Sequence, residues 1–130
     1  MVLPPSNPVV SVGTILQVPG IAEAVSTTRA PVVGVSPIIG GAPVRGMADA
    51  CLSAIGVETS AAAVARHYGA RADGGLLDAW LVDTADADAV AVVEALGIRC
   101  RAVPTLMTDV TETARIAAAC LELADPPVVA

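Results

Sequence analysis

The chain has 130 residues, of which 55% are hydrophobic and 15% charged, and its formal net charge is -6. This is one domain's worth of sequence, and a single core of that size buries roughly 65–70% of the unfolded surface. The cationic side chains are all arginines. An acidic balance excludes a nucleic-acid surface, because neutralising phosphates takes a basic patch. No apolar run approaches the ~18 residues that span a bilayer, and the longest, residues 30–44, is interrupted by prolines and glycines. We therefore expect a soluble protein without a nucleic-acid or membrane partner.

The sulfur and imidazole side chains do not suggest a metal centre. Cys51, Cys100 and Cys120 lie far apart and in no metal-ligand spacing, which is typical of reduced core thiols in a cytoplasmic protein. A single histidine without paired cysteines argues against zinc. The amino terminus has no cationic stretch leading into an apolar one, so the sequence indicates no signal peptide.

The chain opens on a short strand candidate, Val2 to Leu3, followed by a proline-stiffened loop from Pro4 to Gly13. Ser6, Asn7 and Ser11 in this loop can donate hydrogen bonds to a phosphate or a heterocycle. Ser, Asn and Pro are also ordinary turn residues, so a turn followed by a helix cap is an alternative, and the pattern alone favours it.

A second strand is predicted from Pro31 to Ser36, and a glycine-rich loop runs from Ser36 to Gly46. The pair Gly40-Gly41 lets backbone N–H groups approach an anion, a helix N-terminus follows, and Arg45 adds a fixed charge. The segment is a reasonable phosphate cradle, although it matches neither the Walker pattern nor GxGxxG. A glycine-rich connection with a solvated arginine is the equal alternative.

Two helices follow this loop. The first is predicted from Met47 to Ile55, with Gly56 at its end, and its buried face comprises Met47, Ala50, Cys51 and Ala54. The second runs from Ala61 to Tyr68, with Ser60 as its cap and Gly69 as its terminator.

Two more strand and helix pairs complete the chain. Strands are predicted from Asp78 to Asp83 and from Ile98 to Val103. The helix between them starts near Asp86 and buries Ala89, Val92, Val93 and Leu96. The last helix begins after Asp109, whose spacing to Glu112 is that of a capping box, and its buried stripe comprises Ala114, Ala117, Ala118 and Leu121.

Alternating helices and short apolar strands indicate an α/β fold with a mostly parallel sheet covered on both faces. Ligands in such sheets bind beyond the carboxyl ends of the strands, which selects the two loops described above. Other candidates are weaker. For His67, capping the last turn of a helix is a better interpretation than general base catalysis, and Trp80 is expected in the core. Strand-end and N-cap roles account better than metal binding does for three aspartates: Asp83, Asp86 and Asp88.

At these two loops the sequence closely resembles the 2-phospho-L-lactate transferase family. The strings PSNPVVSVGTILQVPGI (Pro5 to Ile21) and APVVGVSPIIGGAPVRGMAD (Ala30 to Asp49) carry the resemblance. VARHYG (Val64 to Gly69), WLVDTAD (Trp80 to Asp86) and PTLMTD (Pro104 to Asp109) extend it. Two separated motifs in the right order are far more specific than either alone.

The resemblance implies a Rossmann-like fold and a transfer reaction. Family members move a 2-phospholactate or phosphoenolpyruvate unit from a guanosine diphosphate-linked donor to the deazaflavin Fo, releasing GMP, in coenzyme F-420 biosynthesis. They require magnesium and are commonly dimers. The resemblance leaves the catalytic residues open. It assigns substrate and phosphate binding to the following residues of the two loops: Ser6, Asn7, Ser11, Gly13, Ser36, Gly40, Gly41 and Arg45.

The departures from the family matter equally. Members are about twice this length or more, and their glycine-rich nucleotide loop and magnesium ligands have no counterpart here. Arg45 replaces the usual lysine, and Met47 stands where proline is common. We expect residues 1–124 to be the carboxyl-terminal part of such a transferase, inactive alone, with residues 125–130 as a tail. A sheet cut at Met1 predicts a homodimer or association with the missing half. A non-catalytic nucleotide-binding or assembly domain is the alternative, and the choice between the two donors stays open.

The assignment depends on geometry. The loop around Ser6 and Asn7 and the loop around Gly40 and Gly41 must converge on a single pocket at one rim of the sheet.

Overall fold

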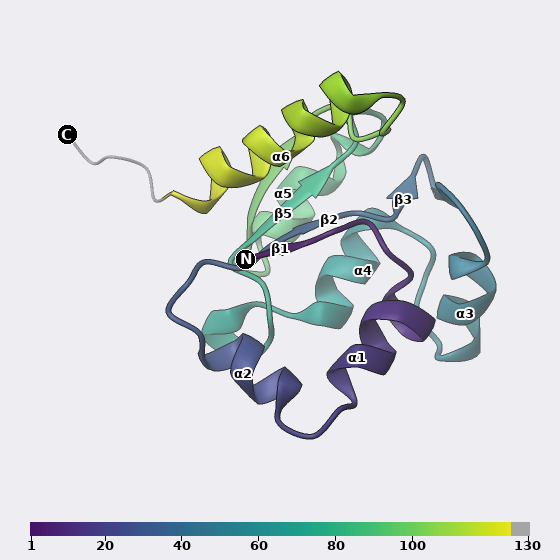
Figure 1. The fold of residues 1–130 in the computed structure, drawn as a ribbon. Coiled ribbons are helices and arrows are strands. Elements are labelled where there is room, and N and C mark those ends of the chain that lie inside the picture. The colour runs from purple at the N-terminus through teal and green to yellow at the C-terminus, as the bar shows by residue number, and fades with distance from the viewer. Residues whose placement is uncertain (126–130) are drawn as a thin grey trace.

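A computed structural model of the protein describes residues 1–125. Its centre is a parallel four-stranded sheet in the order β1-β2-β5-β6 (Figure 1). The predicted α/β class with a mainly parallel sheet is therefore confirmed. Each strand lies inside or at its predicted range: β1 (Val2–Leu3), β2 (Val33–Val35), β5 (Ala79–Val82) and β6 (Arg99–Ala102).

The glycine-pair loop is more ordered than the sequence suggested. It forms a small antiparallel hairpin of β3 (Ile38–Ile39) and β4 (Ala42–Pro43). Gly40 and Gly41 form its turn with φ of 59° and 77°. Two consecutive positive φ values are what a tight two-residue hairpin turn requires, so the glycines are explained by the turn itself.

Helices follow each strand of the parallel sheet in chain order except β2, which the β3-β4 hairpin follows first, and α6 comes after the last strand. A π-helical turn η1 (Pro8–Gly13) continues into α1 (Thr14–Leu16), in line with the alternative of a turn followed by a helix cap, whereas α2 was not anticipated from the sequence. The remaining helices are α2 (Ile21–Thr27), α3 (Ala48–Ala54), α4 (Ala61–Tyr68), η2 (Arg71–Asp73), η3 (Thr84–Asp86), α5 (Ala89–Glu94) and α6 (Val110–Ala124).

The predicted helix caps are largely confirmed. The Ser60 hydroxyl accepts the N–H of Ala63 at 3.1 Å and begins α4, and Gly69 ends it with φ of 76°. The Asp109 carboxylate accepts the N–H of Glu112 at 2.8 Å and begins α6. The Glu112 side chain pairs with Arg115 at 2.6 Å, so only one half of the expected capping box forms.

Two predicted helix faces were wrong. In α3 the buried side chains are Ala48 and Leu52, whereas Met47 is 68% exposed, and Ala50 and Ala54 are exposed too. In α6 the whole predicted stripe is exposed, and the buried residues are Ile116, Cys120 and Leu123. Both helices are rich in alanine, which gives little hydrophobic contrast around the helix. The larger Leu52, Ile116 and Leu123 side chains decide which face is buried.

The predicted face of α5 was partly right. Val93 is fully buried and Ala89 and Leu96 are half-buried, but Val92 is 43% exposed. Val90 packs in its place.

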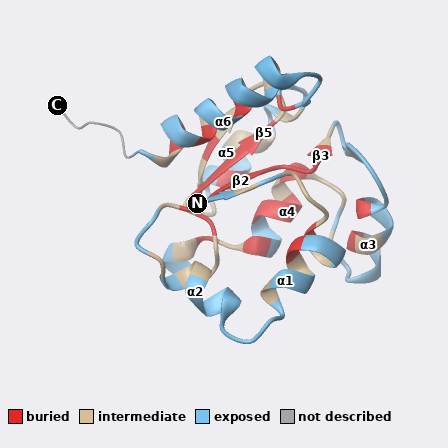
Figure 2. Ribbon diagram, viewed as in Figure 1, coloured by how far each residue is buried: buried red, intermediate tan, exposed pale blue. Residues whose placement is uncertain are grey.

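Two apolar clusters cover the two faces of the sheet (Figure 2). The larger cluster joins α3, α4 and α5 to β5 through Trp80, which is 0% exposed and donates its indole N–H to the Ala61 carbonyl at 3.1 Å. A Cβ on Gly34 would lie 2.5 Å from the Trp80 ring, so the glycine makes room for the indole. The prediction that Trp80 belongs to the core is confirmed. The smaller cluster lies under α6 and includes Val33 and Ile116.

All three cysteines are free, and two of them belong to the core as predicted. Burial, reinforced by the Glu94 carboxylate, raises the pKa of Cys100 to about 11. Burial also raises the pKa of Cys120. Thiols with raised pKa values carry little thiolate and are weak nucleophiles. Cys51 is half-buried beside the first loop.

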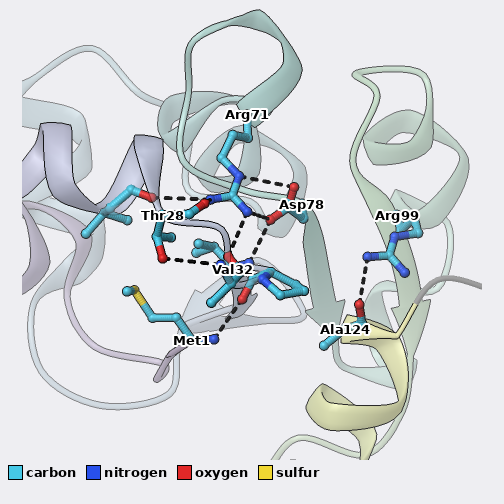
Figure 3. A network of polar contacts seen from close by, with 10 residues as sticks. Met1, Thr28, Val32, Arg71, Asp78, Arg99 and Ala124 are labelled. Atoms are coloured by element: carbon cyan, nitrogen blue, oxygen red, sulfur yellow. Dashed lines mark hydrogen bonds and ion pairs between the residues drawn. The ribbon is translucent and has the colours of Figure 1, made fainter.

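The amino ends of the strands are joined by a polar network (Figure 3). Arg71 pairs with the Asp78 carboxylate and donates to the carbonyl oxygens of Thr28 at 2.7 Å and Ala30 at 2.8 Å. Asp78 in turn accepts the N–H of Val32 at 2.7 Å. One arginine therefore holds the segment after α2 against the start of β5.

No single helix in residues 1–125 has the length and apolar character to cross a membrane. The segments Pro8–Leu16 and Ile21–Thr27 have the required length and apolar character only when they are taken together, and their axes are bent by 89° relative to each other.

Candidate functional site

The carboxyl ends of the strands form one rim. Because the four strands are parallel, the segments that follow them emerge at the same edge of the sheet. These segments are residues 4–13 after β1, 36–47 after β2, 83–88 after β5 and 103–109 after β6. The rim is where ligands of doubly wound folds bind.

A hollow of about 470 Å³ opens between three of these segments. Pro5 of the first predicted loop and Arg45 of the second line the same hollow. The two loops therefore meet at one rim, although Arg45 alone of the eight predicted site residues belongs to the lining of this hollow. The segment after β6 closes the third side, and sequence reasoning had not selected it as part of the site. The full lining is Pro5, Val44, Arg45, Thr105, Leu106 and Met107.

Asn7 caps the turn that begins η1. Its carboxamide oxygen accepts the N–H groups of Val9 at 2.9 Å and Val10 at 3.1 Å. Its amide nitrogen lies 3.5 Å from the Cys51 sulfur, as a donor to it. In this structure Asn7 thus serves the helix-cap role left open by the sequence, and it also ties the first loop to α3.

Ser6, Ser11 and Gly13 do not line the rim hollow. Ser6 and Ser11 border a different hollow of about 290 Å³ between β1, α1 and α2, whose remaining lining is apolar. A Cβ on Gly13 would lie 2.8 Å from the Pro8 carbonyl oxygen, so the close winding of η1 requires glycine there.

The polar groups of the second loop are mostly engaged within the chain. Ser36 is 1% exposed, and its hydroxyl donates to the Ile38 carbonyl at 2.9 Å and accepts the Ile38 N–H at 3.1 Å. The Gly40 N–H donates to the Asp86 carboxylate at 2.9 Å. Arg45 is exposed, and no acidic side chain in residues 1–125 pairs with it.

Asp83 fixes the far wall of the hollow. Its carboxylate accepts the N–H of Ala85 at 3.0 Å and, from the segment after β6, the N–H and hydroxyl of Thr105 at 2.8 and 3.2 Å. Burial opposes ionisation, but these bonds and one from the Thr84 hydroxyl outweigh it and lower the pKa of Asp83. The N-cap role expected for Asp83 is confirmed. Thr105 was missed because its partner is distant in sequence.

The donor set of the described residues does not fit a metal ion. In residues 1–125 no three His, Cys, Asp or Glu side chains come together as ligands. Asp83 and Asp86 use their carboxylates to bind backbone N–H groups. No metal-dependent step can therefore be assigned to these side chains.

The hollow combines one charged group with apolar walls. Arg45 offers a guanidinium that pairs with no acidic side chain of residues 1–125, a fork that suits phosphate oxygens. Val44, Leu106 and Met107 supply apolar surface. A ligand that joins an anionic group to a flat apolar body fits this combination. Fold and site together define a parallel α/β domain with a hollow at its carboxyl rim that is lined by one arginine and by apolar side chains.

Comparison with known proteins narrows this class. The family model of the 2-phospho-L-lactate transferase CofD matches residues 1–116, and the chain belongs to that family. The resemblance read from the two loop strings is thereby confirmed.

Curated relatives share most of this chain but extend well beyond it. The phosphoenolpyruvate transferase of Streptomyces griseus is 67% identical over 125 residues, which are 96% of this chain and 38% of the relative. The corresponding protein of Thermobifida fusca is 61% identical over 124 residues, 95% of this chain and 35% of its own. That of Mycobacterium marinum is 58% identical over 127 residues, 95% of this chain and 36% of its own. The chain thus spans little more than a third of the length of these relatives.

Proposed function

We propose that this chain forms part of a cytoplasmic transferase that moves a phosphoenolpyruvate unit from a guanosine diphosphate-linked donor to the deazaflavin Fo. GMP is released, and the product belongs to coenzyme F-420 biosynthesis. Membership of the CofD family supports the transfer of a phosphorylated three-carbon acid. The names of the relatives favour phosphoenolpyruvate over 2-phospholactate as the unit that is moved.

The observation that carries the proposal is the meeting of the two family loops at one hollow. Arg45 is the group that holds a phosphate oxygen of the donor, and Val44, Leu106 and Met107 are the surface against which the deazaflavin ring lies. In the reaction the acceptor hydroxyl oxygen bonds to the phosphorus that carries the three-carbon unit. The anhydride P–O bond breaks, GMP leaves with its electron pair, and the hydroxyl proton is released. The contribution of these residues is to orient the reactants and to stabilise charge.

Magnesium belongs to the proposal for the complete enzyme. A bound magnesium ion would supply positive charge against the diphosphate of the donor. Because the described residues bring no ligand cluster together, its ligands would come from polypeptide beyond this chain. We accordingly expect no product when the chain alone is incubated with Fo, magnesium and the donor. Robust product formation would contradict this expectation.

Fluorescence titration with Fo tests the assignment of the hollow. We expect the chain to bind Fo. In a separate calorimetric titration with the donor, we expect the Arg45→Ala variant to bind about tenfold more weakly than the unsubstituted chain, the effect of one hydrogen bond to a charged group. Arg66→Ala is the matched control, because Arg66 is also exposed but lies on α4, outside the hollow. Equal donor affinities for the two variants would remove Arg45 from the site. Affinity for guanine nucleotide without any for Fo would favour the alternative, a non-catalytic nucleotide-binding or assembly domain.

A further inference from the structure

One exposed flank of α6 is apolar where a surface helix is normally polar. Val110 is 86% exposed and Leu121 is 65% exposed, and Ala114 and Ala117 between them are exposed as well. The spacing of these four residues, i, i+4, i+7 and i+11, places them in one stripe along the helix. A hollow of about 500 Å³ borders the stripe at Met107, which is 44% exposed.

The charged side chains of α6 show which way this stripe faces. Glu122 pairs with Arg101 of β6, the strand at one edge of the sheet, at 2.9 Å. The flank of α6 that carries Glu122 therefore leans over β6. The apolar stripe lies on the other flank of the buried face, and so it leans toward the opposite edge of the sheet, where β1 lies (Figure 1).

The sheet face beside this stripe is uncovered at β1. Val2 of β1 is in register with Val33 of β2, and side chains of paired residues point to the same face. Val33 is fully buried in the cluster that includes Ile116 of α6. Val2 on the same face is 43% exposed. The apolar flank of α6 and the outer strand thus form two walls of an open corner.

The dimensions of the corner suit a helix. Adjacent strands lie about 4.8 Å apart, and packed helices lie about 8–10 Å apart. A helix beside α6 is therefore displaced by about two strands and comes to lie over β1. Alanines at positions 114 and 117 allow close approach of a neighbouring backbone, between the larger Val110 and Leu121.

We infer that this corner receives a helix from the part of the transferase that the relatives possess and this chain does not contain. The inference rests on the proposed function, because that function requires further polypeptide. Two observations select this occupant. The relatives are more than twice as long as their matched regions, and the corner is continuous with the candidate site, because Met107 lines both hollows. The docked polypeptide lies next to the hollow that it must complete.

A second copy of the chain is the competing occupant of the corner, because an apolar stripe of this kind could also pair with its own copy. The crosslinking experiment below distinguishes the two occupants.

The test co-expresses this chain with the remainder of the Streptomyces griseus relative, the part outside the 125 matched residues, and measures complex formation by sedimentation. We expect a complex, and we expect Ala117→Arg with Leu121→Arg to weaken it about tenfold or more, since the interface would then hold unpaired charges. Val92→Arg is the matched control. Val92 is an exposed apolar residue on α5, whose neighbour Val93 packs on the other face of the sheet, and this variant should associate as the unsubstituted chain does.

Photo-crosslinking gives a second readout that needs no disruptive charge. A photoreactive residue at position 117 should be joined to the remainder polypeptide, and one at position 92 should not. Failure of the remainder to associate, equal association of the charged variants, or crosslinking of position 117 to a second copy of this chain would each overturn the inference. The outcome is separate from that of the proposed function. A complex that depends on the stripe but makes no product would overturn the function alone, and an active complex that ignores the stripe would overturn the inference alone.

Discussion

Two arginines at opposite rims of the same sheet have opposite environments. Arg71 at the amino rim has a side chain only 17% exposed, and it donates to Asp78 and to the backbone of the segment after α2 (Figure 3). Arg45 at the carboxyl rim is exposed and has no acidic partner among residues 1–125. A guanidinium whose donors are all engaged within the chain serves the fold, whereas one left free beside a hollow is available to a ligand. Hydrogen bonds of an arginine thus stabilise the amino rim of the sheet, whereas the arginine at the carboxyl rim borders a hollow.

The difference between the two arginines predicts that replacing Arg71 lowers the stability of the fold more than any other substitution considered below. Replacing Arg71 with Ala removes the partner of a mostly buried Asp78 carboxylate, and we expect the free energy of unfolding to fall by about 3 kcal/mol. Urea denaturation measures the change. Arg45→Ala is the control and should stay within about 0.5 kcal/mol, the range of exposed sites. Similar losses at both positions would mean that the two rims do not differ in the way described.

A smaller loss of stability is expected at Asp83, whose hydrogen bonds hold the segment after β6 at the carboxyl rim. Asp83→Asn weakens the bonds to Ala85 and Thr105, and we expect a loss of about 1–2 kcal/mol near neutral pH. Asp88→Asn is the matched control, because Asp88 stands before α5 without a side-chain capping bond.

The pH dependence at Asp83 has a defined sign. Because the folded-state pKa of Asp83 is lowered from its ordinary 3.8, its contribution is complete above that value and is lost as the pH falls through the folded pKa. The difference in unfolding free energy between Asp83→Asn and the unsubstituted chain should therefore shrink below about pH 4. A difference that grows on acidification would contradict the assignment.

The parts of the structure that depend on local chemistry could be predicted from the sequence. The apolar runs around Val33 and Trp80 gave strands, Ser60 and Asp109 gave helix starts, and the parallel topology followed from the alternation of elements. The rule that ligands bind at the carboxyl rim selected the candidate site, which no ligand tests, and the two loop strings identified the family.

What could not be predicted depends on contacts between distant segments. The bonds from Thr105 to Asp83 and from Arg71 to the backbone of Thr28 cross 22 and 43 residues of sequence. No local pattern marks such partners. The buried face of α6 was missed for a different reason, since its alanines fit either face and the exposed stripe has the same periodicity as a buried one. Ser36 and Asn7 carry polar groups that suit a ligand equally well, and only their partners reveal that they close turns.

The smallest loss of stability is expected for substitutions of Asn7 in the first loop. Asn7→Ala removes the cap of η1 and the contact with Cys51, and caps of this kind contribute about 1 kcal/mol. Asn7→Asp is the informative companion, because its carboxylate still accepts the N–H groups of Val9 and Val10 but cannot donate to the Cys51 sulfur. Urea denaturation should place the aspartate variant close to the unsubstituted chain and the alanine variant below it. If Asn7 contacts a ligand rather than only capping the turn, the aspartate variant will keep its stability but lose affinity for Fo or the donor. If stability and affinity instead change together in both variants, Asn7 only shapes the rim. Arg45 would then remain as the polar group that contacts the ligand.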